Sequence, residues 1–337
     1  MKNEILRRLS ALALGLALLL NAAPLPQAFA VEDDTDASSS DSADSTDTTD
    51  KTVVTTADSD PTVTAAAANA PALDATAALL VSPESDMVLY EKNADEKRYP
   101  ASTTKIMTAL LTLENVSDLS AVVTAEASDF ENVTADSSNA GIKLGEQVTV
   151  KDLLYALMLP SANEAAYMLA RHVSGSWEQF VDMMNERAAE LGCTGTHFCN
   201  PCGLHEDDHY TTAHDLYRIA KQAMKDATFR DIVSTVQHRM AKTNLHEERI
   251  ILTTNQLIFS SFQPWSYANC LGIKTGHTSQ AGNCFVGYAE YGDAKLFSVV
   301  LGCSSSSKEY PTIAASFTDT KSLCQWGFKN FTSKTLA

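Results

Sequence analysis

Apolar positions divide the chain into strands towards its two ends and helices in its middle. Ala77 to Tyr90 predicts two short strands joined by a turn at residues 82–86. After Ile250 the pattern favours strands again. Short turns separate three apolar runs there, Leu271 to His277, Asn283 to Ala289 and Leu296 to Leu301. This order predicts an antiparallel meander.

Helical spacing of apolar residues fills the region between these strands. A helix beginning at Ser102 carries Ile106, Leu110 and Leu111 on one face. Further helices are predicted over residues 151–159, 163–173, 177–191, 212–224 and 316–326, with Thr211 or Thr212 capping the one that starts at 212. Together these elements predict an α+β fold, in which an antiparallel sheet is flanked by helices and accompanied by a helical subdomain. Its edge strands come from both ends of the chain.

Residues 1–30 have the pattern of a secretory signal peptide. Lys2, Arg7 and Arg8 precede an apolar run from Leu9 to Leu20, and Ala28-Phe29-Ala30 supplies small residues for cleavage. This run is shorter than the roughly 20 residues that span a bilayer. We therefore expect the protein to be exported, with an uncleaved anchor as the alternative.

Residues 31–72 differ in composition from the sequence that follows. Residues 31–60 contain ten acidic side chains and one lysine, and so hold nine of the chain's 17 net negative charges. Such a polar segment cannot bury enough apolar surface to offset its chain entropy, which predicts a disordered linker. Residues 73–337 suit a single globular domain. Most of the acidity lies in the linker and says little about the folded domain, and no nucleic-acid partner is expected for this acidic chain.

Seven cysteines all lie within the predicted domain. Their odd number and irregular spacing differ from those of a small disulfide-rich scaffold. One or two disulfide bonds can form after export, and at least one thiol should stay free.

Ser102 and Lys105 are the first pair with catalytic potential. A spacing of three places them on one face of a helix, with Cβ atoms about 5–6 Å apart. Serine becomes a nucleophile when a base removes its proton, and lysine serves as that base only if burial and a second cation lower its pKa. Lys274 is the candidate for the second cation. Taken alone, Ser-x-x-Lys is more often a helix cap followed by a surface lysine.

Ser161 and Asn163 lie at a break between two predicted helices, directly after Pro160. We expect Ser161 to relay a proton between Lys105 and the leaving amine. We expect Asn163 to hold Lys105 and to donate an amide hydrogen to the substrate. A plain helix N-cap is the alternative.

Lys274, Thr275 and Gly276 lie on a predicted strand. Alternation places Lys274 and Gly276 on one face, and the missing side chain of Gly276 leaves room for an extended substrate at the strand edge. Lys274 and Thr275 are candidates for binding a terminal carboxylate. The backbone N–H groups of His277 and Ser102 are candidates for an oxyanion hole. A solvated lysine on an edge strand is the alternative.

His205 and His209 match the H-E-x-x-H pattern of a zinc-dependent peptidase. That pattern works only on a helix, whereas Asp207-Asp208, after the turn-rich residues 200–204, favours a loop. A structural metal is a further alternative, with compactly spaced ligands at Cys199, Cys202, His205 and His209.

In combination, the motifs at Ser102, Ser161 and Lys274 resemble those of serine β-lactamases and penicillin-binding proteins. Three longer stretches resemble the D-alanyl-D-alanine carboxypeptidase branch, the low-molecular-mass penicillin-binding proteins: Tyr99 to Thr108, Thr196 to Leu204 and Gly272 to Thr278. The resemblance runs from about Leu73 to Phe331. It implies a β-lactamase/transpeptidase-like fold.

The resemblance also implies a reaction, namely removal of the last D-alanine from peptidoglycan stem pentapeptides through an acyl-enzyme on Ser102. Penicillins would acylate the same serine. The implied catalytic residues are Ser102, Lys105, Ser161 and Asn163, and the implied substrate-binding residues are Lys274, Thr275, Gly276 and His277. Expected partners are stem peptides ending in D-Ala-D-Ala and β-lactam antibiotics, and no cofactor or metal is expected. The expected location is secreted or extracytoplasmic, in association with the cell wall.

The chain departs from the family pattern in two places. Many members continue into a second β-rich domain and an amphipathic membrane helix, whereas this chain ends soon after Trp326-Gly327-Phe328, so no C-terminal membrane anchor is expected. Cys199 and Cys202 replace residues that are usually not cysteine.

Two further functions compete with the carboxypeptidase interpretation. A serine β-lactamase would carry a glutamate for deacylation, and no convincing motif for it is present; a catalytically silent cell-wall binding module is the other.

Overall fold

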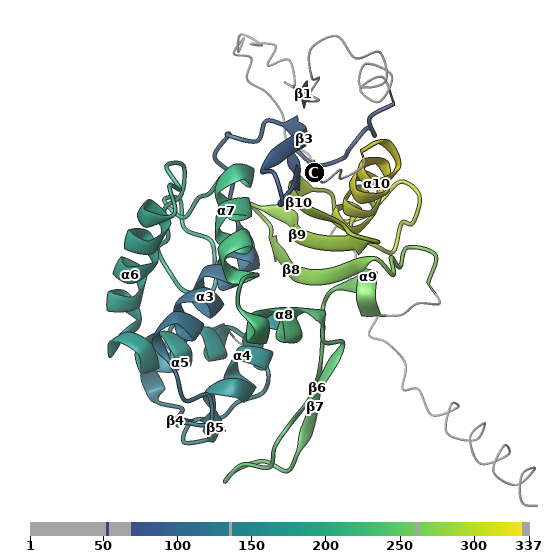
Figure 1. Cartoon of the computed structure of the whole chain (residues 1–337). Coiled ribbons are helices and arrows are strands. Elements are labelled where there is room, and N and C mark those ends of the chain that lie inside the picture. Colours follow the sequence, from purple (N-terminus) through teal and green to yellow (C-terminus); the bar gives the residue numbers. More distant parts are fainter. Residues whose placement is uncertain (1–51, 54–68, 135–136, 260–262, 332–337) are drawn as a thin grey trace, which may run out of the picture. The chain divides into compact units, whose positions relative to one another are not determined.

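The computed structural model describes residues 52–53, 69–134, 137–259 and 263–331 (Figure 1). The chain divides into two units, Met1–Thr48 and Thr49–Ala337, and every described residue belongs to the second. The predicted signal peptide and most of the predicted linker lie outside the described residues. Within the predicted linker, Thr52–Val53 form the short strand β1, which pairs antiparallel with β3 (Met87–Lys92).

An antiparallel sheet forms the centre of this unit, with strand order β1-β3-β2-β10-β9-β8. The remaining strands are β2 (Ala77–Ser82), β8 (Cys270–Thr278), β9 (Gly282–Tyr291) and β10 (Ala294–Cys303). The predicted meander is confirmed as β8–β9–β10, and β2 enters beside β10 with Leu79 opposite Val299. As predicted, the two sheet edges come from opposite ends of the chain.

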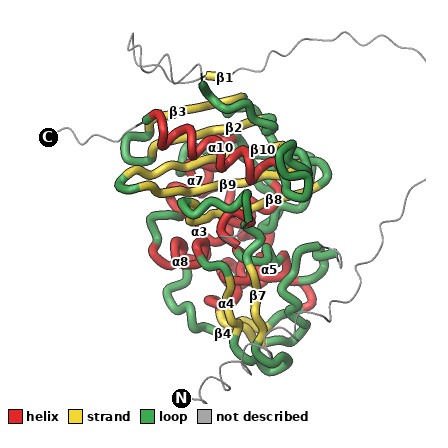
Figure 2. The backbone as a smooth tube through the Cα atoms, turned by 90° about the vertical axis from the view of Figure 1, so that its right-hand side faces the viewer, coloured by secondary structure: helices red, strands yellow, loops and turns green. Residues whose placement is uncertain are grey.

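Helices cover both faces of the sheet. On one face lies α10 (Ala315–Asn330), with the short α9 (Gln256–Phe259) beside it, and on the other lies α7 (Ala213–Ala223) (Figure 1). The helical subdomain comprises α3 (Lys105–Asn115), α4 (Val150–Met158), α5 (Asn163–Ser174), α6 (Trp177–Glu190) and α8 (Ala227–Ser234). Figure 2 shows the strands of the central sheet side by side above this subdomain. The predicted α+β fold is confirmed.

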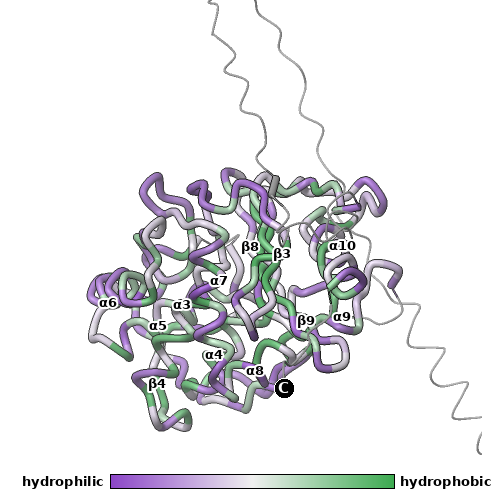
Figure 3. Tube along the Cα trace, turned by 45° about the horizontal axis from the view of Figure 1, so that its top comes forward, coloured by the Kyte–Doolittle hydropathy of each residue, from purple (hydrophilic) through white to green (hydrophobic). Residues whose placement is uncertain are grey.

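Two clusters of buried side chains hold these layers together. Leu79 and Val299 enter the larger cluster, which includes the subdomain helices, whereas Leu80 and Val300 enter the smaller one, which includes α10. Because the central strands are covered on both faces, their middle residues are mostly apolar rather than alternating. Figure 3 shows this concentration of hydrophobic residues along the sheet.

The sequence analysis missed α8, α9 and the smallest elements. The latter are the hairpins β4–β5 (Val122–Thr124 and Gln147–Thr149) and β6–β7 (Gln237–Met240 and Arg249–Leu252), and the 3₁₀ helix η3 (Ala127–Asp129). Strands this short carry too little alternation to be recognised. The side chain of Asn244 joins the two hairpins, accepting from Gln147 N–H and donating to the Gly145 carbonyl.

Neither disulfide bonds nor membrane spans are found in the described part of the chain. All seven cysteines lie there as free thiols, so the disulfides considered above are not formed. None of the helices described is both long enough and apolar enough to cross a bilayer.

Candidate active site

Ser102 lies in a short 3₁₀ helix, η2 (Ala101–Thr104), immediately before α3. This differs from the predicted first turn of an α-helix. Ala101 has a φ of +47°, and Thr103 N–H donates to the Pro100 carbonyl at 3.3 Å, which tightens the turn. Thr103 and Thr104 are buried while Ser102 is partly exposed. The turn is thus fixed by its neighbours and presents the serine hydroxyl.

The ammonium group of Lys105 is fully buried and has three oxygen partners. Nζ lies 2.9 Å from Ser102 Oγ and 2.8 Å from Asn163 Oδ1. It also donates to the Cys202 carbonyl at 2.7 Å. Burial lowers the pKa of Lys105 to about 8. A lysine with this pKa is partly neutral at physiological pH and can accept the proton of Ser102.

Lys274 lies in β8 and is equally buried, with 1% of its surface exposed. Its Nζ donates to the Thr275 carbonyl at 3.1 Å. Burial lowers the pKa of Lys274 well below its usual value, and the charge of Lys105 lowers it further. We predicted that burial and a second cation together lower the pKa of Lys105. Burial does so, but the effect of the neighbouring cation is found at Lys274 rather than at Lys105.

Ser161 and Asn163 lie at the start of α5. Asn163 N–H donates to the Ser138 carbonyl at 2.9 Å. Because Oδ1 of Asn163 accepts from Lys105, its amide nitrogen remains as a donor for another partner. Ser161 has a φ of +67°, and its hydroxyl is buried without a hydrogen-bond partner among the described residues. Both side chains therefore keep unused hydrogen-bonding capacity.

Gly276 brings β8 close to the serine turn. The predicted alternation is present, since Lys274 and Gly276 are buried while Thr275 and His277 are more exposed. A Cβ atom on Gly276 would lie 3.0 Å from both the Pro100 carbonyl oxygen and the Ser102 nitrogen. The glycine thus makes room for the backbone of η2. Our prediction had assigned that room to an extended substrate.

One cleft of about 620 Å³ collects most of the predicted site residues. Those that line it are Ser102, Ser161, Asn163, Thr275, Gly276 and His277. Lys105 and Lys274 are not among the lining residues and lie buried behind the wall. The other lining side chains are mostly hydroxyl and amide groups. The cleft therefore presents neutral polar groups above two buried amines.

A family model described as D-alanyl-D-alanine carboxypeptidase, peptidase family S11, matches residues 64–305. The chain belongs to this family. The match begins within the predicted linker and covers the three motifs that line the cleft.

Individual relatives of this carboxypeptidase-family chain agree with the match. The D-alanyl-D-alanine carboxypeptidase of Streptomyces sp. strain K15 is 36% identical over 71% of this chain and 82% of its own length. For the D-alanyl-D-alanine carboxypeptidase DacF of Bacillus subtilis, the identity is 34% over 69% of this chain and only 58% of the relative. The crystal structure of the Streptomyces K15 DD-transpeptidase aligns with a TM-score of 0.69 at 33% identity, over 77% of this chain and 99% of that one. The predicted transpeptidase-like fold is confirmed.

The sequence analysis of this family member missed the carbonyl group of Cys202. Asn200 Oδ1 accepts from the N–H groups of Cys202, at 3.2 Å, and Gly203, at 2.7 Å, and so closes a turn. Gly203 has a φ of +85°, and a Cβ there would lie 1.9 Å from the Ala101 carbonyl oxygen. This turn aims the Cys202 carbonyl at Lys105. The composition of residues 200–204 predicts a turn, but it does not predict which carbonyl group of the turn accepts a hydrogen bond from Lys105.

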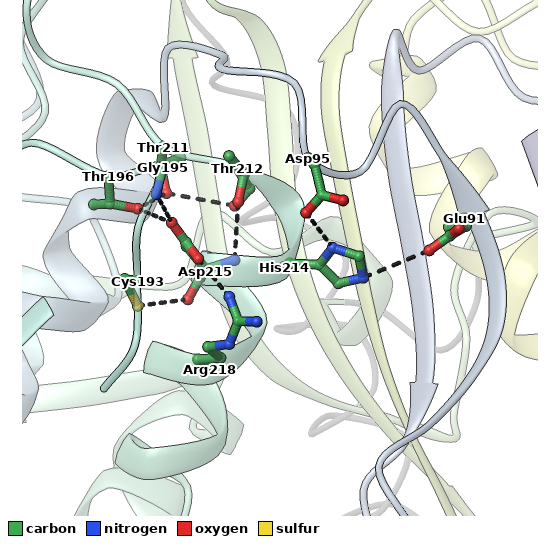
Figure 4. A network of polar contacts seen from close by, with 10 residues as sticks. All are labelled: Glu91, Asp95, Cys193, Gly195, Thr196, Thr211, Thr212, His214, Asp215 and Arg218. Carbon is green, nitrogen blue, oxygen red and sulfur yellow. Dashed lines mark hydrogen bonds and ion pairs between the residues drawn. The ribbon is translucent and has the colours of Figure 1, made fainter. Parts of the chain in front are cut away.

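A polar network on α7 anchors the segment that carries this turn (Figure 4). Asp215 Oδ2 accepts from Gly195 N–H and from Thr196 Oγ1, each at 2.8 Å, and Oδ1 pairs with Arg218 at 2.6 Å. Thr196 Oγ1 also lies 2.9 Å from Thr211 Oγ1. Both ends of the segment 195–212 are thereby fixed to one helix.

His209 supports η2 from behind. Cys199 N–H donates to His209 Nδ1 at 3.0 Å, which leaves Nε2 to donate to Thr104 Oγ1 at 2.8 Å. Burial lowers the pKa of His209 to about 3, so the ring is neutral. Residues 205–209 form a loop with a turn rather than a helix, as predicted. With both ring nitrogens in use, His209 fits neither zinc alternative, and in the described ranges no three candidate ligands cluster.

Glu164 is a further residue that the sequence analysis missed. Its Oε1 accepts from the N–H groups of Ala140, at 2.7 Å, and Ile142, at 3.4 Å, which fixes the loop leading from the cleft wall. Burial raises the pKa of Glu164, and its charge acts on Lys105. An acidic residue in the apolar first turn of α5, directly after Asn163, is the signal that could have revealed it.

Proposed function

We propose that this protein is a serine-type D-alanyl-D-alanine carboxypeptidase, which removes the terminal D-alanine from peptidoglycan stem pentapeptides. One observation carries the proposal: Lys105 Nζ, with a pKa lowered to about 8, lies 2.9 Å from the Ser102 hydroxyl, which lines an open cleft. Family membership supports the substrate class. The enzyme acts outside the cytoplasm on the cell wall, with residues 1–30 as signal peptide, 31–72 as linker and 73–337 as catalytic domain.

In the acylation step, neutral Lys105 accepts the proton of Ser102 while Oγ attacks the carbonyl carbon of the penultimate D-alanine. The backbone N–H groups of Ser102 and His277 stabilise the negative oxygen that forms. The proton then passes from Lys105 through the Ser161 hydroxyl to the leaving amine. The amide bond breaks, D-alanine leaves, and the remaining peptide is an ester of Ser102.

In the deacylation step, a water molecule attacks the carbonyl carbon of this ester while neutral Lys105 accepts a proton from the water. Ser102 Oγ leaves and recovers the proton from Lys105, which regenerates the site. Asn163 holds Lys105 and donates to the substrate amide.

The substrate lies along β8. Thr275, whose Oγ1 lies 2.5 Å from Thr254 Oγ1, binds the terminal carboxylate together with His277. Lys274 orders the strand from beneath, through its hydrogen bond to the Thr275 carbonyl.

Mass spectrometry of the intact protein after exposure to benzylpenicillin tests the nucleophile. We expect one covalent adduct, mapped to Ser102, and release of D-alanine from a peptide ending in D-Ala-D-Ala. Ser102→Ala should lose the adduct and at least about 10³-fold of the hydrolysis rate. Ser234→Ala, at the end of α8 and not among the residues that line the cleft, should retain both.

An adduct on another residue, or undiminished hydrolysis by Ser102→Ala, would contradict the proposal. The lifetime of the adduct separates the two serine activities. Loss within seconds, without release of D-alanine from the peptide, would identify a β-lactamase instead, whereas a lifetime of hours supports the carboxypeptidase.

A further inference from the structure

A second cavity, of about 560 Å³, lies beside the catalytic cleft. The stretch that leads into η2, the turn between β8 and β9 and the loop that ends at Tyr210 form most of it, and Thr76 and Gly302 complete the lining. The larger side chains that line it include Lys97, Arg98, Tyr99, Tyr210 and Gln280. None of them has a role in the reaction proposed above.

Only a thin partition separates this cavity from the cleft. Gln280 lines both spaces. Tyr99 lines the cavity and His205 the cleft, and their rings meet edge to face with centroids 4.6 Å apart. Asp207, on the cavity side, lies 3.5 Å from the same imidazole. A substrate bound in the cleft can therefore reach the cavity by passing one ring pair and one glutamine.

Two cationic side chains, Lys97 and Arg98, line the cavity against one carboxylate, Asp207, and both cations have spare binding capacity. Lys97 Nζ lies 3.8 Å from the centre of the Tyr210 ring, a cation–π contact that holds the ammonium in place. No carboxylate of the described residues lies within ion-pair distance of Lys97. Arg98 pairs with Glu96 through Nη2, but its Nε is buried without a hydrogen-bond partner in the described region. A buried donor without an acceptor costs free energy that an anionic ligand would recover.

The backbone of the cavity is fixed before any ligand binds. Arg98 N–H donates to the Thr211 carbonyl at 2.8 Å, and Thr211 N–H donates back to the Arg98 carbonyl at 2.9 Å. Thr211 in turn belongs to the network around Asp215 in Figure 4. Such pre-organisation reduces the entropy lost on binding.

The cleft itself offers no comparable group. Among its lining residues the only basic side chains are His205 and His277, because Lys105 and Lys274 are buried behind the wall. Lysine and arginine side chains instead line the neighbouring cavity, where a second carboxylate of a peptide could meet them.

We infer that this basic cavity is a subsite for a carboxylate of the peptide substrate, bound by Lys97 and Arg98. The inference rests on the proposed peptidase function. The carboxylate belongs either to the stem that carries the scissile bond or to a second stem joined through the leaving amine. The chemistry of recognition is the same in both cases.

Two matched pairs of peptides test the inference. The first pair ends in D-Ala-D-Ala and has an internal carboxylate that is either free or amidated. In the second pair the penultimate D-alanine is linked to the side-chain amine of a diamino acid, whose own carboxylate is free or amidated. We expect a preference for the free acid of about five- to tenfold in kcat/KM in at least one pair, and that pair identifies the source.

Lys97→Gln and Arg98→Gln should each reduce this preference while leaving the amidated peptides almost unaffected. Lys151→Gln, an exposed lysine on α4, is the matched control and should keep the preference. Acylation by benzylpenicillin, which is small enough for the cleft alone, should not change in any variant. This readout shows that the variants are folded and that the catalytic groups are intact.

Equal rates for free and amidated peptides in both pairs would overturn the inference, as would a preference that survives in both Lys97→Gln and Arg98→Gln. Binding of the same peptides to Ser102→Ala, measured by titration calorimetry, gives a readout that needs no turnover. If no peptide is cleaved by the unaltered protein, the proposed function fails. The subsite is then judged by whether the free acid binds Ser102→Ala about five- to tenfold more tightly than the amide.

Discussion

At the scale of single residues, the site depends on two buried amines whose pKa values are both lowered. Lys105 has three oxygen partners, whereas the Thr275 carbonyl is the hydrogen-bond partner of Lys274 within the described region. Burial lowers both pKa values, and the charge of Lys105 adds to the effect on Lys274. With a pKa of about 8, Lys105 keeps its proton in most molecules at neutral pH. It becomes a base only in the fraction of molecules that have lost this proton.

The lowered pKa of Lys105 predicts a rising pH profile for acylation. Below its pKa of about 8, Lys105 is mostly protonated and cannot accept the Ser102 proton. The rate constant for acylation by benzylpenicillin should therefore rise about tenfold per pH unit between pH 6 and 7 and level off above about pH 8. Stopped-flow measurements with buffers of constant ionic strength give the profile.

Glu164→Gln provides the matched control for this profile. The charge of Glu164 favours protonated Lys105, so its removal should shift the midpoint to lower pH without abolishing acylation. A profile that is flat from pH 6 to 9 in the unaltered protein would show that Lys105 is not the base.

At the scale of elements, the contact between β8 and η2 sets the position of the nucleophile. Gly276 lies against the backbone of Pro100, Ser102 and Thr103, so the strand and the turn touch without an intervening side chain. Backbone atoms on both sides leave little room for adjustment. The distance from Ser102 to Lys105 is consequently controlled by an element far away in the sequence.

Gly276→Ala should separate strand and turn and slow acylation by about 10²-fold, because small displacements of reacting groups have large kinetic effects. Single-turnover acylation by benzylpenicillin measures this loss. Gly292→Ala is the control, since its φ of +59° strains alanine but no atom lies within 4 Å of the added Cβ. It should cost about 1 kcal/mol of stability and leave acylation unchanged. Similar kinetics in both variants would refute a positioning role for Gly276.

Long apolar runs and short motifs were the parts of this structure that sequence could predict. The strands β8 to β10 and the helices around Ser102 and Asn163 follow from hydrophobic pattern, because these elements are long enough to show a period. The Cys202 carbonyl is different, since every residue has a carbonyl and only folding selects one. The close approach of Gly276 to η2 and the electrostatic effect of Glu164 on Lys105 likewise arise between segments that are distant in the sequence. Pattern and spacing carry no information about them.

At the scale of the whole described unit, the sheet and the helical subdomain meet at the cleft. Its walls come from β8 on one side and from η2 and the start of α5 on the other. The relative position of these parts depends on how the sheet is held between its two helical layers. On the α10 side, Asp319 contributes by accepting from Ala75 N–H at 2.8 Å, which fixes the chain just before β2. This bond joins the two ends of the described domain.

Asp319 makes the stability of this unit depend on pH. Burial raises the pKa of its carboxyl group to about 6, above the value of about 3.9 in an unfolded chain. The stabilising contribution of the protonated form is therefore complete below about pH 4 and is lost as the pH rises through 6. Asp319→Asn keeps an oxygen acceptor for Ala75 N–H without the charge. At pH 7 it should be more stable than the unaltered protein by about 1–2 kcal/mol, after allowance for partial exposure.

Urea unfolding at pH 7 and pH 4.5 measures this difference, which should shrink at the lower pH as Asp319 becomes protonated in the folded protein. Asp118→Asn is the control, because the pKa of Asp118 is lowered whereas that of Asp319 is raised. Hydrogen bonds from Ser120 lower the pKa of this exposed carboxylate, so its removal should not stabilise the protein at pH 7. An Asp319→Asn variant that is less stable than the unaltered protein at both pH values would show that the ionised carboxylate strengthens the junction between β2 and α10, and that its burial carries no net cost.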